Sequence, residues 1–311
     1  MKTTITPKAL QKGDTIAIFS PATTVKREQL EGAVPTLEKL GFNVRVMPHA
    51  LGPADGTYAA HEELRLKDFL DAYSDPEVRA VLCSRGGYGA VHFIDALSPE
   101  LLRSDPKWVI GFSDVSALHA MMRRAGIASL HSSMTKHLSE FPSDDYVNTS
   151  LVKILTGSKE MEYRGPADSR NIFGEGRGEL RGGNLAVLDG LVGTDFDVLI
   201  PKEGEEVILF IEDISEAIYR TERMVRRLAL CGALSHYKGI IVGQFTDSGS
   251  SLNYECTADM LRERLPQWGA KDIPIAFDFP IGHFAGNLPV VHGSDATLVV
   301  DAEGSRLTFR M

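Results

Sequence analysis

Residues Lys107 to His119 read Lys-Trp-Val-Ile-Gly-Phe-Ser-Asp-Val-Ser-Ala-Leu-His, and the order of apolar and polar residues in this stretch indicates the fold class. The apolar run from Trp108 to Phe112 predicts a strand that ends abruptly at Ser113. Apolar side chains then recur at helical spacing until Gly126, which predicts a helix. A serine in such a turn lies above the edge of a parallel sheet, where a helix N-terminus favours developing negative charge. The stretch predicts either a nucleophile at Ser113 or a serine that caps the helix.

The first half of the chain alternates between strand and helix patterns. In order, the sequence predicts a strand at Thr15–Phe19, a helix at Arg27–Leu40, a strand at Asn43–Met47, a helix at Glu62–Tyr73 and a strand at Val78–Cys83. This alternation is typical of a parallel sheet, which binds ligands at the carboxyl ends of its strands. The loop Ser84–Gly89 follows the last of these strands, so we expect it to lie beside Ser113.

The second half of the chain has a separate pattern, which predicts a second α/β domain. We expect an N-terminal Rossmann-like domain over residues 1–160, a linker over 161–178 and a C-terminal α/β domain over 179–311. Within the last domain the sequence predicts a strand at Glu206–Ile211, a helix at Glu216–Cys231, and a closing hairpin from Ala296–Val300 and Arg306–Phe309.

Composition is that of an ordinary soluble protein, because 43% of the 311 residues are hydrophobic and 24% are charged. No apolar run approaches the roughly 20 residues that span a bilayer, and the N-terminus lacks a signal-peptide core. We therefore expect a cytoplasmic protein without membrane association. The net charge of -9 disfavours binding to nucleic acid. Cys83, Cys231 and Cys256 are scattered, so we expect no disulfide framework, no metal and no cofactor.

A serine nucleophile needs a base, and histidine is the usual choice. His283 stands out among the nine histidines because glycines and prolines hold it in a loop after a predicted strand. The alternative is a loop histidine exposed to water. The base needs a carboxylate partner, for which Glu212 at the end of an apolar strand is the best candidate and Asp213 the fallback. Either carboxylate could instead cap the next helix.

An acyl-transfer site also needs backbone donors for an oxyanion. The N–H of Asp114 would supply one, and Gly86 or Gly87 the second. The same glycine-rich loop lacks the sequence pattern of a phosphate cradle. Arg85 and Arg181 lie in glycine-rich loops and suit a peptide carboxylate; the alternative is that they form salt bridges that tie the two domains together.

Five motifs occur in order along nearly the whole chain: Ser84-Arg-Gly-Gly-Tyr-Gly89, Gly111-Phe-Ser-Asp114, Arg181-Gly-Gly-Asn184, Phe210-Ile-Glu-Asp213 with Tyr219-Arg220, and Pro280-Ile-Gly-His283. Together they resemble the LD-carboxypeptidases, the muramoyltetrapeptide carboxypeptidase family of serine peptidases. The resemblance implies that Ser113 is the nucleophile, His283 the general base and Glu212 its orienting partner. It also implies that the site lies between the two domains.

The same resemblance implies a homodimer that removes the terminal D-alanine from cytoplasmic murein tetrapeptides during cell-wall recycling. A related branch, the microcin C immunity peptidases, shares the triad and cleaves a peptide-nucleotide conjugate. The Ser113 turn lacks the second glycine of the α/β-hydrolase elbow, so that fold is not expected. A non-catalytic peptide-binding protein is a further alternative, although it leaves the three candidate catalytic residues without a purpose.

Overall fold

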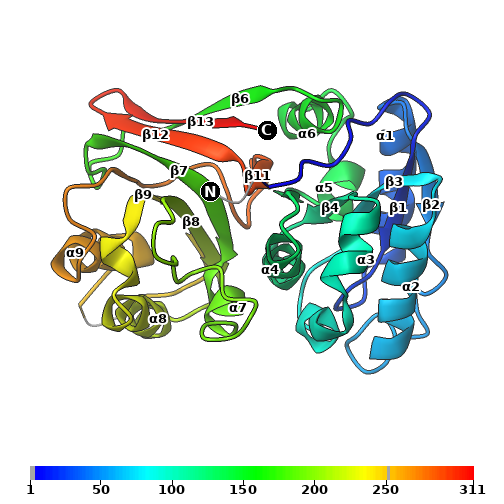
Figure 1. The fold of residues 1–311 in the computed structure, drawn as a ribbon, viewed down its shortest axis with the longest axis horizontal. Helices are drawn as coiled ribbons and strands as arrows, with labels where there is room; N and C mark the ends of the chain where they lie inside the picture. Colours follow the sequence, from blue (N-terminus) through cyan, green and yellow to red (C-terminus); the bar gives the residue numbers. More distant parts are fainter. Residues whose placement is uncertain (1–3, 251–252) are drawn as a thin grey trace. The chain divides into compact units, whose positions relative to one another are not determined.

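The alternation of strands and helices along the chain produces two separate sheets (Figure 1). The structure is a computed structural model that describes residues 4–250 and 253–311. Its described residues divide into an N-terminal unit, residues 4–159 with 288–290, and a C-terminal unit, residues 160–287 with 291–311. Each unit combines one sheet with helices, which confirms the predicted two-domain α/β fold class.

Five parallel strands form the body of the sheet in the N-terminal unit. They are β1 (Thr15–Phe19), β2 (Asn43–Val46), β3 (Val78–Cys83), β4 (Trp108–Gly111) and β5 (Ser129–His131). Their spatial order is 2-1-3-4-5, the flavodoxin-like form of the doubly wound arrangement, with β11 (Val290–His292) at the edge beside β5. In such a sheet the strand order reverses between β1 and β3, and the ligand crevice lies at their carboxyl ends.

Helices and 3-10 turns lie between these strands and follow the last of them. They are α1 (Arg27–Lys39), α2 (Glu62–Ser74), α3 (Pro99–Ser104), α4 (Ser116–Arg124), α5 (Thr135–Glu140) and α6 (Tyr146–Leu155), with 3-10 turns η1 (Ala90–His92), η2 (Ile94–Ala96) and η3 (Ser113–Val115). Side-chain caps start two of them, since Ser98 accepts from the N–H of Leu101 and Asp145 from that of Val147. Residues 116–122 of α4 are all buried, so the helix behind Ser113 is a core element.

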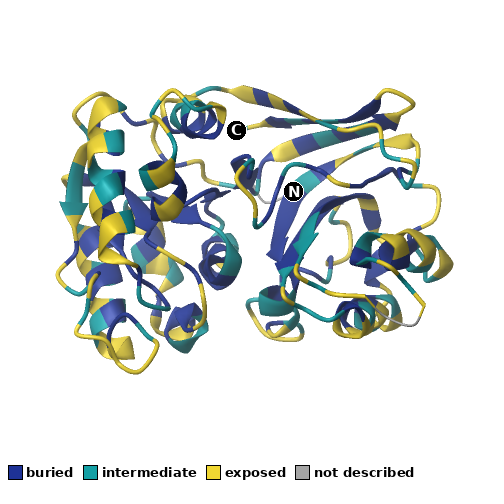
Figure 2. Ribbon diagram, turned by 180° about the vertical axis from the view of Figure 1, so that it is seen from behind, coloured by how far each residue is buried: buried dark blue, intermediate teal, exposed yellow. Residues whose placement is uncertain are grey.

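The C-terminal unit contains a mixed sheet of seven strands. They are β6 (Glu160–Gly165), β7 (Gly174–Asn184), β8 (Val207–Ile214), β9 (Tyr237–Thr246), β10 (Ile275–Ala276), β12 (Asp295–Asp301) and β13 (Gly304–Arg310), in the order 10-9-8-7-12-13-6. The first four of that order are parallel and the last three antiparallel. The central strand β8 is buried from Val207 to Asp213, whereas β12 alternates between buried and more exposed residues (Figure 2).

Three α-helices and a 3-10 turn accompany this second sheet. They are α7 (Leu185–Asp189), α8 (Ile218–Leu230), α9 (Thr257–Gln267) and η4 (Ala233–Ser235). Helix α8 buries Ile218, Val225 and Leu228, as its helical spacing predicts. Within residues 4–250 and 253–311, none of the helices has both the length and the apolar character needed to cross a membrane.

The structure corrects the expected linker at residues 161–178. This stretch contains most of β6 and the beginning of β7, and it belongs to the C-terminal unit. Strand β6 pairs with β13 from Glu160 opposite Arg310 to Gly165 opposite Ser305. The glycine-rich sequence reads as a loop, but long-range pairing with β13, β12 and β8 makes it a strand. Residues 288–290 belong to the N-terminal unit, so the C-terminal unit is not one continuous segment.

Candidate active site

Ser113 occupies the turn that leads from β4 into η3 and α4. Its φ of 65° lies in a region that residues other than glycine seldom adopt. The N–H of Val115 donates to the carbonyl of Phe112 over 3.3 Å and closes the turn. Neither η3 nor α4 begins with a side-chain cap, so the capping alternative for Ser113 is wrong. The serine is partly exposed on a strained strand-to-helix turn, as a nucleophile requires.

The loop Ser84–Gly89, hereafter the Gly86 loop, lies directly beside this serine. A Cβ atom placed on Gly86 would be 2.8 Å from Ser113 Cβ, 2.9 Å from Ser113 Oγ and 3.2 Å from the Asp114 nitrogen. Only glycine fits so close to the hydroxyl, and the predicted proximity of loop and serine is confirmed. Among the described residues the N–H groups of Gly86 and Gly87 have no acceptor, so they can donate to an oxyanion.

Loops from neighbouring strands hold the Gly86 loop in place. The hydroxyls of Ser84 and Ser20 are 2.5 Å apart, and the Thr135 hydroxyl donates to the Ser84 carbonyl over 2.6 Å. The N–H of Tyr88 donates to the Thr23 hydroxyl over 3.1 Å. Because these partners follow β1 and β5, the loop is fixed from both sides of β3 at the carboxyl end of the sheet.

The side chain of Asp114 holds the far end of the same loop. Its carboxylate is 2% exposed and accepts from the N–H of Ala90 over 2.8 Å. Burial raises the pKa of Asp114 to about 6, although hydrogen bonds from the N–H groups of Ala90 and Gly89 act against this rise. The carboxylate faces the loop backbone, so its visible role is to position the loop.

His119 supports the strand end from behind, a role that no sequence pattern revealed. Its Nε2 lies 2.8 Å from the carbonyl oxygen of Gly111, and its Nδ1 lies 2.9 Å from the hydroxyl of Ser129. Burial lowers the pKa of His119 to about 4, so the imidazole is neutral near pH 7. A neutral ring that donates through Nε2 and accepts through Nδ1 satisfies both partners.

In the C-terminal unit, Glu212 and His283 form a direct pair. Glu212 Oε2 lies 2.6 Å from His283 Nδ1, and the glutamate side chain is fully buried while that of His283 is 14% exposed. A carboxylate at Nδ1 fixes the tautomer with the proton on that nitrogen, which makes Nε2 the basic nitrogen. The structure thus joins the two residues that the sequence proposed as acid and base.

Asp213, the fallback acid, makes different contacts. Neighbouring residues of a strand point to opposite faces, and Asp213 accepts from the Asn184 side chain and from the N–H of Ala186, each over 2.9 Å. Asn184 in turn caps α7 through the N–H of Val187. Burial raises the pKa of Asp213 to about 6. Asp213 therefore orients the start of α7, whereas Glu212 orients the histidine.

An irregularity in β9 positions the loop that carries His283. The register between β8 and β9 shifts between Ile211 and Asp213, so the ladder is irregular at Glu212. Beyond this shift, the N–H of Gln244 donates to the Ile281 carbonyl over 2.8 Å. The N–H of Gly282 donates to the side-chain oxygen of buried Asn287 over 2.9 Å. Backbone contacts thus fix the residues immediately before His283.

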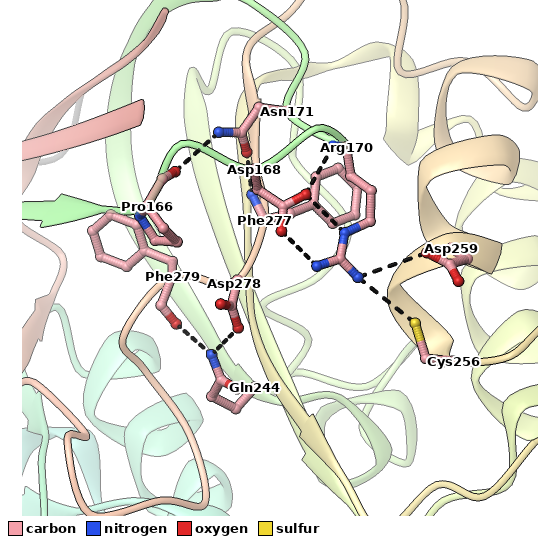
Figure 3. Close-up of polar contacts among 10 residues, drawn as sticks. All are labelled: Pro166, Asp168, Arg170, Asn171, Gln244, Cys256, Asp259, Phe277, Asp278 and Phe279. Carbon is pink, nitrogen blue, oxygen red and sulfur yellow. Dashed lines mark hydrogen bonds and ion pairs between the residues drawn. The ribbon is translucent and has the colours of Figure 1, made fainter. Parts of the chain in front are cut away.

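A second set of polar contacts anchors the chain that enters this loop (Figure 3). The Gln244 side chain donates to Asp278 over 2.7 Å, and the N–H of Phe277 donates to the Asn171 side chain over 2.8 Å. The guanidinium of Arg170 lies over the Phe277 ring at 6.0 Å from its centroid. Residues that the sequence assigned to a linker therefore help to place the histidine loop.

The two arginines proposed as carboxylate ligands lie in different environments. Arg181 is fully buried in β7, and its guanidinium is 2.6 Å from Glu205, a residue of the same unit. This contact favours the salt-bridge alternative for Arg181, although not as a tie between units. Arg85 is exposed on the Gly86 loop and donates to the carbonyl of Thr24 over 2.9 Å. It is the arginine that an incoming carboxylate can reach.

Comparison with known proteins covers both units. Residues 16–132 match the LD-carboxypeptidase N-terminal domain and residues 177–298 the LD-carboxypeptidase C-terminal domain, both of peptidase family S66. The chain is 32% identical to the "Probable murein peptide carboxypeptidase" of Bacillus subtilis, over 94% of this chain and 91% of that protein. It resembles the solved muramoyltetrapeptide carboxypeptidase of Oxalobacter formigenes at 26% identity (TM-score 0.81; 96% and 99% of the two chains). An MccF-like protein from Bacillus anthracis is 25% identical (TM-score 0.86; 99% of each chain).

Proposed function

The chain belongs to the LD-carboxypeptidase family of serine peptidases, and on this premise we propose that it releases the terminal D-alanine from cytoplasmic murein tetrapeptides during cell-wall recycling. The observation that carries the proposal is the 2.6 Å pair of Glu212 and His283, which makes Nε2 the basic nitrogen. The names of the Bacillus and Oxalobacter relatives support the substrate class.

In the proposed mechanism Ser113, His283 and Glu212 act as one triad. His283 Nε2 takes the proton of the Ser113 hydroxyl as Oγ attacks the carbonyl carbon of the bond between the L-centre and D-alanine. The imidazolium is stabilised by Glu212 and then returns the proton to the amine of the leaving D-alanine. Water, activated by the same imidazole, attacks the acyl-serine and restores the hydroxyl.

The N-terminal unit would supply the remaining groups of this mechanism. We assign the oxyanion donors to the N–H of Asp114 and to that of Gly86 or Gly87, because the Gly86 loop lies against the nucleophile. We assign the terminal carboxylate of the substrate to Arg85, whose guanidinium is exposed on the same loop. Burial and the Glu205 contact argue against such a role for Arg181.

The likeness to the MccF-like protein favours a second candidate, an immunity peptidase of the microcin C type with the same triad. Both candidates need a serine nucleophile, so substrate choice separates them. Purified protein should be offered a murein tetrapeptide with an L,D-linked terminal alanine, its L,L-linked isomer and an aminoacyl-sulfamoyl nucleoside, with EDTA present. We expect released alanine from the L,D-peptide alone, detected by mass spectrometry. Cleavage of the nucleoside conjugate alone would support the second candidate and exclude the first.

Oligomeric state and compartment complete the proposal. We propose a homodimer in the cytoplasm, the arrangement that the family resemblance implies. Light scattering on the purified protein should give about twice the 34.0 kDa mass of the chain. Fractionation of the native cells should recover the protein with the cytosol. A monomer at micromolar concentration would exclude the dimer and leave the triad unaffected.

A further inference from the structure

Arg65 is a buried cation that the proposed mechanism does not use. It lies in the first turn of α2, and its side chain is only 1% exposed. A cation there opposes the helix dipole, and burial lowers the pKa of Arg65 because it penalises the charged form. A buried guanidinium needs hydrogen-bond partners, so the groups that supply them define what Arg65 holds in place.

The partners of Arg65 come from the loops that surround the nucleophile. Its Nε donates to the carbonyl of Ala60 over 2.9 Å, and its Nη1 donates to the carbonyls of Gly89, over 2.8 Å, and Pro21. Its Nη2 lies 3.2 Å from Nδ1 of His92. Pro21 follows β1 and Gly89 follows β3, so one guanidinium joins the two loops at which the strand order of the sheet reverses.

One peptide group links Arg65 to the serine turn. The carbonyl of the Gly89–Ala90 peptide accepts from Arg65, and the N–H of the same peptide donates to the Asp114 carboxylate over 2.8 Å. A cation and an anion therefore hold the two ends of a single peptide plane. Asp114 follows Ser113 directly, and Gly86 contacts Ser113 at the other end of the loop. The orientation of the Gly86 loop relative to the nucleophile depends on this peptide.

We propose that Arg65 is a positioning residue that sets the Gly86 loop, and with it the oxyanion donors, against Ser113. This role rests on the proposed function, since it needs a serine nucleophile. A displacement of about 1 Å in a catalytic group can cost roughly 10²-fold in rate. Loss of Arg65 should therefore lower kcat by a larger factor than it raises KM, because the loop donors act on charge that develops in the transition state.

A purely structural role for Arg65 is the competing explanation, and Lys107 provides the matched control. Lys107 is also a cation that is 1% exposed in the N-terminal unit, and it also donates to a backbone carbonyl, that of Asp75. It precedes β4, at the opposite end of the strand from Ser113. Lys107→Met should lower the thermal midpoint and leave the rate within roughly threefold, because it is remote from the loop donors.

The experiment compares Arg65→Met, Arg65→Lys and Lys107→Met with the unmodified protein, each well below its thermal midpoint. The probe is a fluorophosphonate: Ser113 Oγ bonds to phosphorus, fluoride leaves with the electron pair of the P–F bond, and His283 takes the hydroxyl proton. The phosphonyl oxygen occupies the oxyanion position, so the labelling rate reports the loop donors without any assumption about the peptide substrate. We expect labelling and kcat to fall by roughly 10²-fold in Arg65→Met and by roughly tenfold in Arg65→Lys.

The outcomes separate this role from the proposed function. Labelling of Arg65→Met at the unmodified rate would overturn the positioning role and leave the triad intact. If Arg65→Met does not fold, Arg65→Lys carries the same comparison, and an unchanged rate in that variant would overturn the role equally. Slow labelling of the Arg65 variants supports it even if no tetrapeptide is cleaved. Absence of labelling in the unmodified protein would exclude Ser113 as a nucleophile, and it would therefore exclude the positioning role of Arg65 as well.

Discussion

The Ser113 turn and the His283 loop place their side chains by different means. Main-chain geometry fixes Ser113, through a φ of 65° and a glycine pressed against the hydroxyl. A side-chain contact orients the His283 ring, through a carboxylate 71 positions earlier in the sequence. Every contact described around Ser113 lies within the N-terminal unit, whereas those of the histidine loop lie within the C-terminal unit.

Because the two side chains are held differently, the two regions should tolerate different substitutions. A serine held by its backbone keeps its position when surrounding side chains change, as long as the loop beside it stays in place. A histidine whose Nδ1 faces a buried carboxylate loses its tautomer preference when that carboxylate changes.

Removing either reactive group should nearly abolish turnover. We expect Ser113→Ala and His283→Ala each to lower kcat by roughly 10^4 to 10^6-fold, because the nucleophile and its base work in the same step. Thermal midpoints should stay within a few degrees of the unmodified protein, since both side chains are partly exposed. Steady-state release of D-alanine measures kcat. Near-normal turnover in Ser113→Ala would exclude Ser113 as the nucleophile.

Substitution of the two adjacent carboxylates of β8, Glu212 and Asp213, should lower kcat to very different extents. Glu212→Gln should lower kcat by roughly 10² to 10^4-fold, because an amide keeps a contact to Nδ1 but cannot stabilise the imidazolium. Asp213→Asn is the matched control, because an amide oxygen can still accept from the N–H of Ala186, and it should cost less than roughly tenfold. The kcat of both variants measures the contrast, and equal losses would contradict the division of roles between the two carboxylates.

Recognition of the substrate carboxylate should depend on the Gly86 loop beside Ser113, which carries Arg85. A C-terminally amidated tetrapeptide should show kcat/KM at least roughly 100-fold below that of the acid, because a charged site group loses its partner. Arg85→Met should lower kcat/KM for the acid and change it little for the amide. Comparable values for acid and amide in the unmodified protein would rule out carboxylate recognition, and with it the carboxypeptidase reaction.

The smallest effect concerns stability around Asp114. Burial raises its pKa to about 6, so between its unfolded value and about 6 the native state binds more protons than the unfolded state. The contribution of Asp114 to the free energy of unfolding is therefore largest at low pH and is lost as the pH rises through about 6. Between about pH 4 and pH 7.5 the free energy of unfolding of the unmodified protein should fall by on the order of 2 kcal/mol relative to that of Asp114→Asn. Urea unfolding of both proteins at each pH measures this difference. A pH-independent difference between the two would contradict the raised pKa.

The Ser113 turn was predictable from sequence because its signals are local. An apolar run, a serine and a helical repeat lie within one short segment, and the neighbouring loop is rich in glycine. Strand β3 carries that loop to the same sheet edge, so the approach of Gly86 to Ser113 follows from the parallel topology. The role of Arg65 was not predictable, because its partners are backbone carbonyls from loops that carry no mark in the sequence.

Strand β7 and the linker show the opposite case. Glycines are poor strand formers, so Gly174–Asn184 reads as a loop. The structure shows their reason: a Cβ on Gly182 would collide with the Phe210 carbonyl of β8, so close approach of two backbones requires glycine there. The partner of Arg181 was equally hidden, because Glu205 lies in a connection rather than in a motif. The secondary structure and contacts of such residues depend on partners that are distant in the sequence, so local sequence patterns do not predict them.

We expect Ser113 and the Glu212–His283 pair to act as one catalytic unit. A double-mutant cycle tests this expectation. It compares the single-turnover rate constants of Ser113→Ala, His283→Ala and the double variant on the L,D-linked tetrapeptide. Groups that work in a single step are strongly non-additive, so we predict that the double variant is within roughly tenfold of either single variant. Losses that multiply, giving a double variant slower than either single variant by roughly 10^4-fold or more, would contradict the claim.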